Sequence, residues 1–109
     1  MTTVDSAPKR MLKLTVRVRA RDGHQGKPIT DLLMSLYKSH GFKGATVVQG
    51  VRGYGKHGVS RADVLGLSMN VPVVVETVDE EGKIRSILPD VKAIVGSNGL
   101  ATIEPVEVL

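Results

Sequence analysis

The most constraining feature of the sequence is a strand–helix–strand pattern that occurs twice. In the first copy, apolar and polar residues alternate strictly over residues 12–18, which is typical of a strand with one buried face. Apolar residues then recur at helical spacing over residues 29–37, after Pro28, whose fixed φ suits a first helical turn. Gly41 suits the position just after this helix, and a β-rich stretch at residues 45–51 completes the copy.

The second copy follows the same plan after a glycine-rich segment. Residues 71–78 form an almost wholly apolar strand, and Asp79 is expected to cap the helix that follows. Pro89 falls inside that helix and should kink it, because proline lacks an N–H and crowds the preceding turn. Residues 100–108 form the last strand, in which Pro105 predicts a sheet edge or a bulge.

Two such units predict an α+β, ferredoxin-like βαββαβ fold, with a four-stranded antiparallel sheet and two helices on one face. The length of 109 residues suits a single domain, which we place at residues 11–109, after a flexible N-terminal tail at residues 1–10. The other face of the sheet then lacks a cover. The third strand is apolar on both faces, with Val73 and Val75 on one and Val74 and Val78 on the other, so a monomer would expose one of these pairs. We therefore expect the sheet to mediate oligomerisation.

Composition excludes several classes of function. The absence of cysteine excludes disulfides and thiolate chemistry, and it agrees with a cytoplasmic location. The first ten residues do not resemble a signal peptide, and no apolar run approaches the roughly 20 residues that span a bilayer. We therefore expect no membrane insertion. The net charge of +4 is modest, which favours a solvated surface over a nucleic-acid partner.

Catalytic and metal sites are not indicated. None of His24, His40 and His57 shares metal-ligand spacing with another histidine or with a carboxylate pair on one helix face. His57, Ser60 and Asp63 are close in sequence, but a catalytic triad is defined by geometry and not by adjacency. We therefore expect no catalytic residues, no metal and no resident cofactor.

The glycine-rich segment at residues 50–58 is the main candidate site. Glycine lets the backbone approach a ligand, and N–H groups beside cations suit an anion such as phosphate. The candidate ligand-binding residues here are Arg52, Gly53, Tyr54, Gly55, Lys56, His57 and Arg61. A hairpin or bulge that only turns the chain is the alternative. A dinucleotide fingerprint is disfavoured, because the segment follows the second strand of a short chain.

A second glycine-containing segment has both a structural and a functional interpretation. It either ends the second helix or offers a small nest of N–H groups to a ligand. The candidate binding residues here are Gly96, Ser97 and Asn98.

Charged residues on the strands also have two interpretations. Glu76, in the apolar third strand, either pairs with Arg17 or Arg19 or faces a cleft between subunits. A basic stripe on the first strand is expected to be neutralised across the sheet by acidic residues of the last strand. The residues involved are Lys13, Arg17, Arg19 and Arg21 on one side and Glu104 and Glu107 on the other.

Several short motifs occur in an order that resembles a known family. They are Gly26-Lys27-Pro28, Gly44-Ala45-Thr46-Val47, Gly50-x-x-Gly53-Tyr54-Gly55, Leu67-Ser68, Pro72-Val-Val-Val-Glu76 and Ile87-Leu88-Pro89. With this order, residues 11–109 resemble the PII-like family catalogued as domain of unknown function 190. The resemblance implies a compact trimer with adenine nucleotides bound in clefts between subunits, and residues 52–61 and 96–99 as the cleft walls. The long PII signalling loop is not recognisable, and Tyr54 lies too early to match its modifiable tyrosine.

The leading hypothesis is a PII-like regulatory or ligand-sensing protein that binds an adenine nucleotide of the AMP, ADP or ATP type between subunits. Its partners would be two further copies of the chain and a regulated protein. The alternatives are a structural or adaptor trimer without a small-molecule ligand, and an RNA-binding module. The RNA-binding alternative is disfavoured, because residues 12–19 and 71–78 lack the aromatic side chains that stack on bases. No nucleophile–base pair supports an enzyme.

Overall fold

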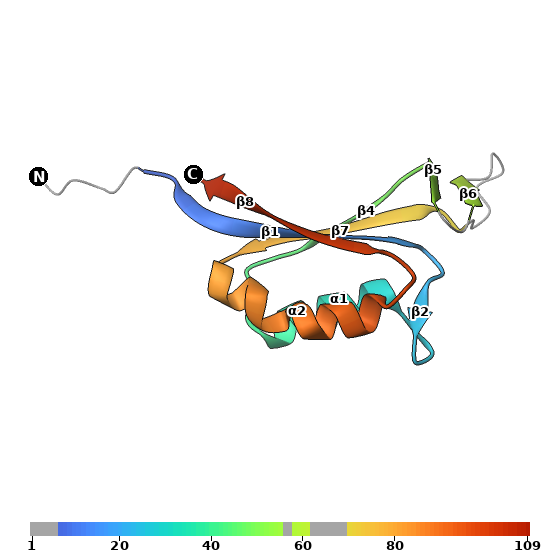
Figure 1. Cartoon of the computed structure of the whole chain (residues 1–109), viewed down its shortest axis with the longest axis horizontal. Helices are drawn as coiled ribbons and strands as arrows, with labels where there is room; N and C mark the ends of the chain where they lie inside the picture. Colours follow the sequence, from blue (N-terminus) through green and yellow to red (C-terminus); the bar gives the residue numbers. More distant parts are fainter. Residues whose placement is uncertain (1–6, 56–57, 62–69) are drawn as a thin grey trace, which may run out of the picture.

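The computed structural model describes residues 7–55, 58–61 and 70–109. Its centre is a four-stranded antiparallel sheet in the order β4-β7-β1-β8, with both helices on one face (Figure 1). The predicted ferredoxin-like fold is confirmed. The sheet strands are β1 (Lys9–Arg19), β4 (Thr46–Gln49), β7 (Pro72–Asp79) and β8 (Leu100–Val108), and the helices are α1 (Ile29–Ser39) and α2 (Glu81–Val95). Two short ribbons complete the fold: β2 (Gly23–His24) with β3 (Lys27–Pro28), and β5 (Arg52–Gly55) with β6 (Gly58–Arg61).

The core lies between the helices and one face of the sheet. The alternation predicted over residues 12–18 is confirmed, because Leu12, Leu14, Val16 and Val18 all point into this layer. The buried apolar residues are Leu12, Leu14, Val16 and Val18 of β1, Val73 and Val75 of β7, Ile29, Leu33 and Tyr37 of α1, and Ile84, Ile87, Val91 and Val95 of α2. Burial of one aliphatic side chain is worth roughly 1.5–3 kcal/mol, so this layer holds both helices on the sheet.

α1 begins and ends where the sequence predicts. Pro28 precedes its first residue with a φ of −60°. At the other end Gly41 takes a φ of 71°, the left-handed conformation that glycine adopts readily. The N–H of Phe42 donates to the carbonyl of Tyr37 at 3.0 Å, and the N–H of Gly41 to that of Lys38 at 3.1 Å. This Schellman motif turns the chain toward β4.

Asp79 does not cap α2, so this expectation was wrong. β7 extends one residue further than predicted, and Asp79 pairs with Leu12 as its last residue. The side chain therefore points to the helix face of the sheet, where it is fully buried. Its carboxylate accepts the N–H groups of Glu80 at 2.8 Å and Lys43 at 3.1 Å. Asp79 thus ties the loop before β4 to the end of β7, and Glu80 precedes α2 without a side-chain cap.

α2 contains Pro89 within its single span of residues 81–95. Ile87 and Val91, on the apolar face before and after the proline, are both fully buried. Packing against the sheet therefore continues across the position where the helix lacks one N–H donor. Of the helices in the described part of the chain, none is long and apolar enough to cross a membrane.

β8 and β4 form the two edges of the sheet. β8 carries Pro105, so the edge position predicted from this proline is confirmed. β4 ends at Gln49, two residues before the end of the predicted strand. Gly50 comes next in the register, and its N–H donates to the carbonyl of Pro72 at 2.7 Å. Proline has no N–H to return the second bond of the pair, so the ladder ends here.

The second face of the sheet, called the open face below, carries no helix among the described residues (Figure 1). Its apolar side chains lie near water: Val48 is 52% and Leu100 is 58% exposed, and Val74 and Val78 are half-buried. The expectation that the third strand is apolar on both faces is confirmed. By the strand registers, the open face includes Lys13, Thr15, Val48, Val74, Glu76, Val78, Leu100, Thr102 and Glu104.

Candidate ligand-binding site

The glycine-rich segment forms a hairpin at one end of the sheet (Figure 1). β5 and β6 pair antiparallel, with Arg52 opposite Arg61 and Gly55 opposite Gly58. The sequence left a turn-forming hairpin and a ligand-binding loop as alternatives, and the hairpin geometry is compatible with both. Lys56, His57 and the side chain of Arg61 lie outside the described residues.

Two of the glycines serve the fold. A Cβ atom added at Gly50 would lie 2.9 Å from Cγ of Pro72, and one added at Gly53 would lie 3.2 Å from the same atom. Neither glycine has a positive φ, so the close approach to Pro72 is what disfavours a side chain, more strongly at Gly50 than at Gly53. Gly55 is different, because a Cβ atom there would have no neighbour within 4 Å. Of these three, only Gly55 has open space beside it.

The side chains of Arg52 and Tyr54 are open to solvent in the single protomer. Arg52 is exposed and Tyr54 is 87% exposed. Burial of the apolar surface of a tyrosine ring is favourable in free energy, and an exposed ring does not receive this stabilisation. Tyr54 is therefore available to a ligand base or to a neighbouring subunit, the two roles that the sequence left open.

The loop at residues 96–99 ends α2 and brings the chain close to β1. Gly96 has a φ of 55°, its N–H donates to the carbonyl of Lys92 at 2.9 Å, and the N–H of Asn98 donates to that of Val95 at 3.1 Å. These bonds support the interpretation that the loop ends the helix. Because they use the N–H groups of Gly96 and Asn98, a nest of N–H groups for a ligand would be centred on the backbone of Ser97. A Cβ atom at Gly99 would collide with the carbonyl oxygen of Arg17, so this loop is held tightly against the sheet.

The two candidate segments lie at the same end of the sheet but on opposite edges (Figure 1). The β5–β6 hairpin follows the edge strand β4, and the 96–99 loop precedes the edge strand β8. β7 and β1 lie between them, so the two edges are about 14 Å apart at the usual strand spacing. One protomer therefore does not bring the predicted site residues together into one cluster.

The charges of the open face form a small network on the central strands. The ammonium of Lys13 lies 3.3 Å from Oε1 of Glu104 and 3.9 Å from Oε2 of Glu76. Neutralisation across the sheet, expected for the basic stripe, is confirmed for Lys13 and Glu104. For Glu76 the sequence named Arg17 or Arg19 as partner, whereas the structure gives Lys13. All three charged groups are partly exposed, so each pair contributes at most about 1 kcal/mol.

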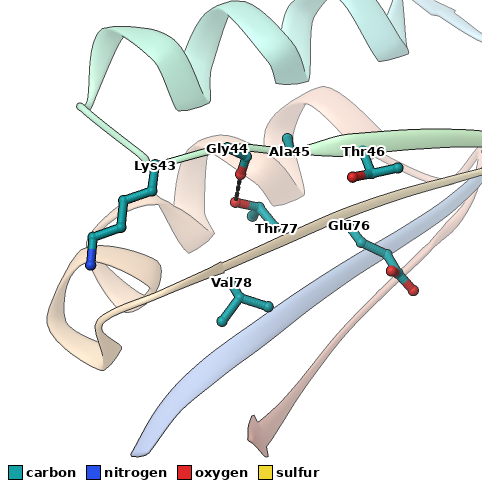
Figure 2. A pocket seen from close by; sticks show the side chains of 7 residues that line it. All are labelled: Lys43, Gly44, Ala45, Thr46, Glu76, Thr77 and Val78. Atoms are coloured by element: carbon teal, nitrogen blue, oxygen red, sulfur yellow. Dashed lines mark hydrogen bonds between the residues drawn. The ribbon is translucent and has the colours of Figure 1, made fainter. Parts of the chain in front are cut away.

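A hollow of about 440 Å³ lies where β4 begins beside β7 (Figure 2). Its lining includes Lys43, Thr46, Glu76 and Val78. The hydroxyl of Thr77 donates to the carbonyl of Gly44 at 2.6 Å, on the opposite side of β7 from Glu76 and Val78 (Figure 2). This hollow was not predicted from the sequence, although a position facing a cleft was one of the two interpretations of Glu76. The hollow lies where the pairing of β4 with β7 begins, at Thr46 and Glu76, and that register was not predicted.

Clusters of metal-binding side chains are absent from the described residues, 7–55, 58–61 and 70–109. Within these ranges no three histidine, aspartate or glutamate side chains are grouped as a metal site would require.

Comparison with known proteins places the chain in a family. Residues 11–108 match the family of domain of unknown function 190, described as an uncharacterized ACR. A UPF0166 protein of Methanocaldococcus jannaschii is 38% identical over 90 residues, which cover 83% of each chain. A UPF0166 protein of Aquifex aeolicus is 39% identical over 89 residues, covering 81% of this chain and 83% of that protein.

Solved structures with the same fold are PII-like proteins. CPII of Thiomonas intermedia K12, a nitrogen regulatory PII-like protein bound to ADP, AMP and bicarbonate, superimposes with a TM-score of 0.69 at 16% identity. The match covers 93% of this chain and 97% of CPII. A putative PII-like signaling protein of Thermus thermophilus gives a TM-score of 0.68 at 20% identity over 92% and 90% of the two chains. The chain described here thus belongs to the family of domain of unknown function 190 and has the PII-like fold.

Proposed function

We propose that this protein is a PII-like regulator that binds an adenine nucleotide in clefts between the subunits of a homotrimer. The observation that carries the proposal is the position of the two candidate segments, at one end of the sheet but on its opposite edges. Two edges about 14 Å apart cannot both contact one phosphate group. A cleft that places both segments around one phosphate would take the hairpin from one subunit and the 96–99 loop from another.

The open face supports the assembly of several copies. It presents Val48, Val74, Val78 and Leu100 without a covering element among the described residues. Val48 and Val74 are neighbours in the register, and Arg17 lies between Val74 and Leu100. Exposed apolar side chains on an uncovered sheet face are typical of a protein interface. The charges of Lys13, Glu76 and Glu104 lie on the same face, and their pairing reduces the free energy needed to bury them.

The ligand chemistry follows from the β5–β6 hairpin. Arg52 can bind a phosphate through two parallel hydrogen bonds, and Lys56, His57 and Arg61 add further cationic groups in the same ten residues. Tyr54 offers an exposed ring to the base. The ADP and AMP bound to CPII, which has the same fold, support an adenine nucleotide as the ligand.

The backbone N–H groups of the glycines would add to this cradle. Gly53 and Gly55 bring the backbone of the hairpin close to the phosphates, as the small size of glycine allows. The opposite wall would come from the neighbouring subunit, through Gly96, Ser97 and Asn98. Phosphate contacts would then fix the hairpin in one arrangement and change the surface that a regulated protein meets. This role needs no catalytic residue.

An RNA-binding function is less well supported. The four strands of the sheet, β1, β4, β7 and β8, contain no phenylalanine, tyrosine or tryptophan. Domains that bind single-stranded RNA on such a sheet stack bases on aromatic side chains of the strands. An adaptor trimer without a ligand would share the open face but would leave the cations of the hairpin without a role.

Calorimetric titration with AMP, ADP and ATP tests the proposal. We expect binding by the natural protein and a loss of affinity of about tenfold or more in Arg52→Ala, since charge-assisted hydrogen bonds are worth ~1.5–3 kcal/mol. Arg85→Ala is the matched control, because Arg85 is an exposed arginine of α2 that pairs with Glu81 at 2.7 Å. No heat of binding at millimolar nucleotide would leave the adaptor trimer as the better account.

Light scattering tests the assembly independently of the ligand. The natural protein should have three times the mass of the chain. Val78→Glu places a charge on the open face and should lower the mass to that of a smaller species, whereas Lys92→Glu, an exposed residue of α2, should not. A monomer at micromolar concentration in the natural protein would contradict the proposed trimer.

A further inference from the structure

Pro72 lies at the point where the β5–β6 hairpin leaves the sheet. It is the first residue of β7, and the register of β4 continues to it through Gly50. The carbonyl of Pro72 accepts the N–H of Gly50 at 2.7 Å, which is the last bond of the ladder. Because proline cannot donate the reciprocal bond, the chain after Gly50 is free to turn away from β7.

The ring of Pro72 also contacts the chain after this turn. Positions for a Cβ atom at Gly50 and Gly53 lie 2.9 and 3.2 Å from Cγ of Pro72, which places both backbones against one edge of the ring. Gly50 is the last residue before the turn and Gly53 is the second residue of β5. A rigid ring wedged between these two points restricts the angle between β4 and β5.

We propose that Pro72 is a positioning residue, whose ring against Gly50 and Gly53 sets the direction of the β5–β6 hairpin and thereby places Arg52 and Tyr54 for the ligand. The effect of Pro72 on ligand affinity rests on the proposed function. Its effect on the direction of the hairpin does not, so the two can be measured separately.

The contact distances predict how substitutions at these positions interact. Gly50→Ala and Gly53→Ala push a methyl group into the Pro72 ring and should turn the hairpin away from its natural direction. Pro72→Ala removes Cγ and leaves Cβ, which lies 3.7 Å from the Gly50 methyl position and 3.5 Å from that of Gly53. Both are ordinary van der Waals contacts, so the added methyl groups no longer collide in the double variants.

Residual dipolar couplings of the β5 and β6 amides, compared with those of β1 and β7, measure the direction of the hairpin in each variant. We expect a changed direction in Gly50→Ala and, to a smaller extent, in Gly53→Ala. Gly55→Ala is the matched control in the same hairpin, because nothing lies within 4 Å of its Cβ position. Thermal unfolding of each variant shows whether the core is intact. If Gly50→Ala fails to fold, the milder Gly53→Ala carries the test.

Nucleotide titration of the same single and double variants gives a double-mutant cycle for ligand affinity. We expect Gly50→Ala and Pro72→Ala each to lower the affinity, by about tenfold for Gly50→Ala, and the double variant to bind like Pro72→Ala alone. Effects that multiply in the double variant would overturn the proposal, as would an unchanged hairpin direction in both glycine variants. If the natural protein binds no nucleotide, the proposed function fails, and the dipolar couplings still decide whether Pro72 directs the hairpin.

Discussion

The ammonium of Lys83 lies 3.3 Å from the buried carboxylate of Asp79 and also donates to the carbonyl of Gly41 at 2.7 Å. It lies 5.3 Å from the centre of the Phe42 ring, within the range of a cation–π interaction. The carboxylate accepts the N–H groups of Lys43 and Glu80 as well. This cluster joins the C-terminal ends of α1 and β7 to the first turn of α2, at the opposite end of the sheet from the β5–β6 hairpin (Figure 1).

Replacement of Asp79 should destabilise the fold strongly. In Asp79→Asn an amide replaces the carboxylate, so one oxygen must serve three donors, while the NH2 group lies among them. We expect a loss of about 2–4 kcal/mol in the free energy of unfolding, measured by urea denaturation at pH 7. Glu81→Gln weakens an exposed pair with Arg85 instead and should cost less than about 1 kcal/mol. Equal losses of unfolding free energy in the two variants would contradict a structural role for the buried Asp79 carboxylate.

The same carboxylate should make stability depend on acid pH. Burial alone raises the pKa of Asp79, but the N–H groups of Glu80 and Lys43 and the Lys83 ammonium outweigh it and hold the pKa below its ordinary value of 3.8. A lowered pKa stabilises the fold above the unfolded pKa, and this stabilisation disappears as the pH falls through the folded pKa. The natural protein should therefore lose stability below about pH 4. Asp79→Asn, followed by urea denaturation from pH 7 to pH 2, should lose less over that range.

The sequence predicted the elements better than their ends. The alternation over residues 12–18 and the helical spacing over residues 29–37 are repeated patterns with several independent positions, so both elements were found. Asp79 was wrongly predicted to cap α2, because an aspartate just before a helical pattern is typical of an N-cap residue. Only the pairing with Leu12 shows that β7 continues through Asp79. β4 was predicted too long because its length depends on Pro72, a residue of another strand.

The residues of the candidate site were proposed from composition, and their geometry was not predicted from the sequence. The composition of residues 50–58 predicted cations and glycines in one loop, and of these the described strand β5 contains Arg52, Gly53 and Gly55. The contact of Gly50 and Gly53 with Pro72 links residues about 20 positions apart in sequence, and no local pattern records it. The hollow beside Glu76 was missed for the same reason, because it arises from the register of two strands.

Tyr37 should show an abnormal titration at alkaline pH. Its hydroxyl is buried without a hydrogen-bond partner among the described residues, and burial raises its pKa from 10.0 to about 12. A raised pKa gives stability that is complete below the unfolded pKa and is lost as the pH rises through the folded pKa. Tyr54→Phe leaves Tyr37 as the sole tyrosine, since the chain has two, and its absorbance at alkaline pH should titrate near 12.

Tyr37→Phe provides the matching stability test. Removal of an unpaired buried hydroxyl should leave the stability at pH 7 unchanged or raise it by up to about 1 kcal/mol. The ring would keep its stacking on Phe42, whose centre lies 5.4 Å away. The loss of stability between pH 10 and 12 should be smaller in this variant, and an unaltered alkaline loss would speak against burial as the cause of the raised pKa.

Gly99 should be the least replaceable glycine of the described chain. A methyl group there would meet the backbone of Arg17 and lie 2.6 Å from Cγ1 of Val18, and neither can move without disturbing β1. We expect Gly99→Ala to lower the free energy of unfolding by about 2–3 kcal/mol, measured by urea denaturation. Gly82→Ala is the control: it lies in α2 with nothing within 4 Å, and it should raise stability by up to about 1 kcal/mol. Similar behaviour of the two variants would contradict the close approach at Gly99.

The central claim is that each nucleotide site combines the hairpin of one subunit with the 96–99 loop of another, and subunit mixing tests it most directly. Arg52→Glu and Ser97→Asp each place a negative charge on one exposed wall, so neither variant alone should bind nucleotide. When the two are unfolded together and reassembled in equal amounts, about a quarter of the clefts should contain two natural walls. The account predicts that binding capacity returns to about this fraction of that of the natural protein. If each site lies within one subunit, the mixture contains no intact site, and the absence of recovered binding would contradict the claim.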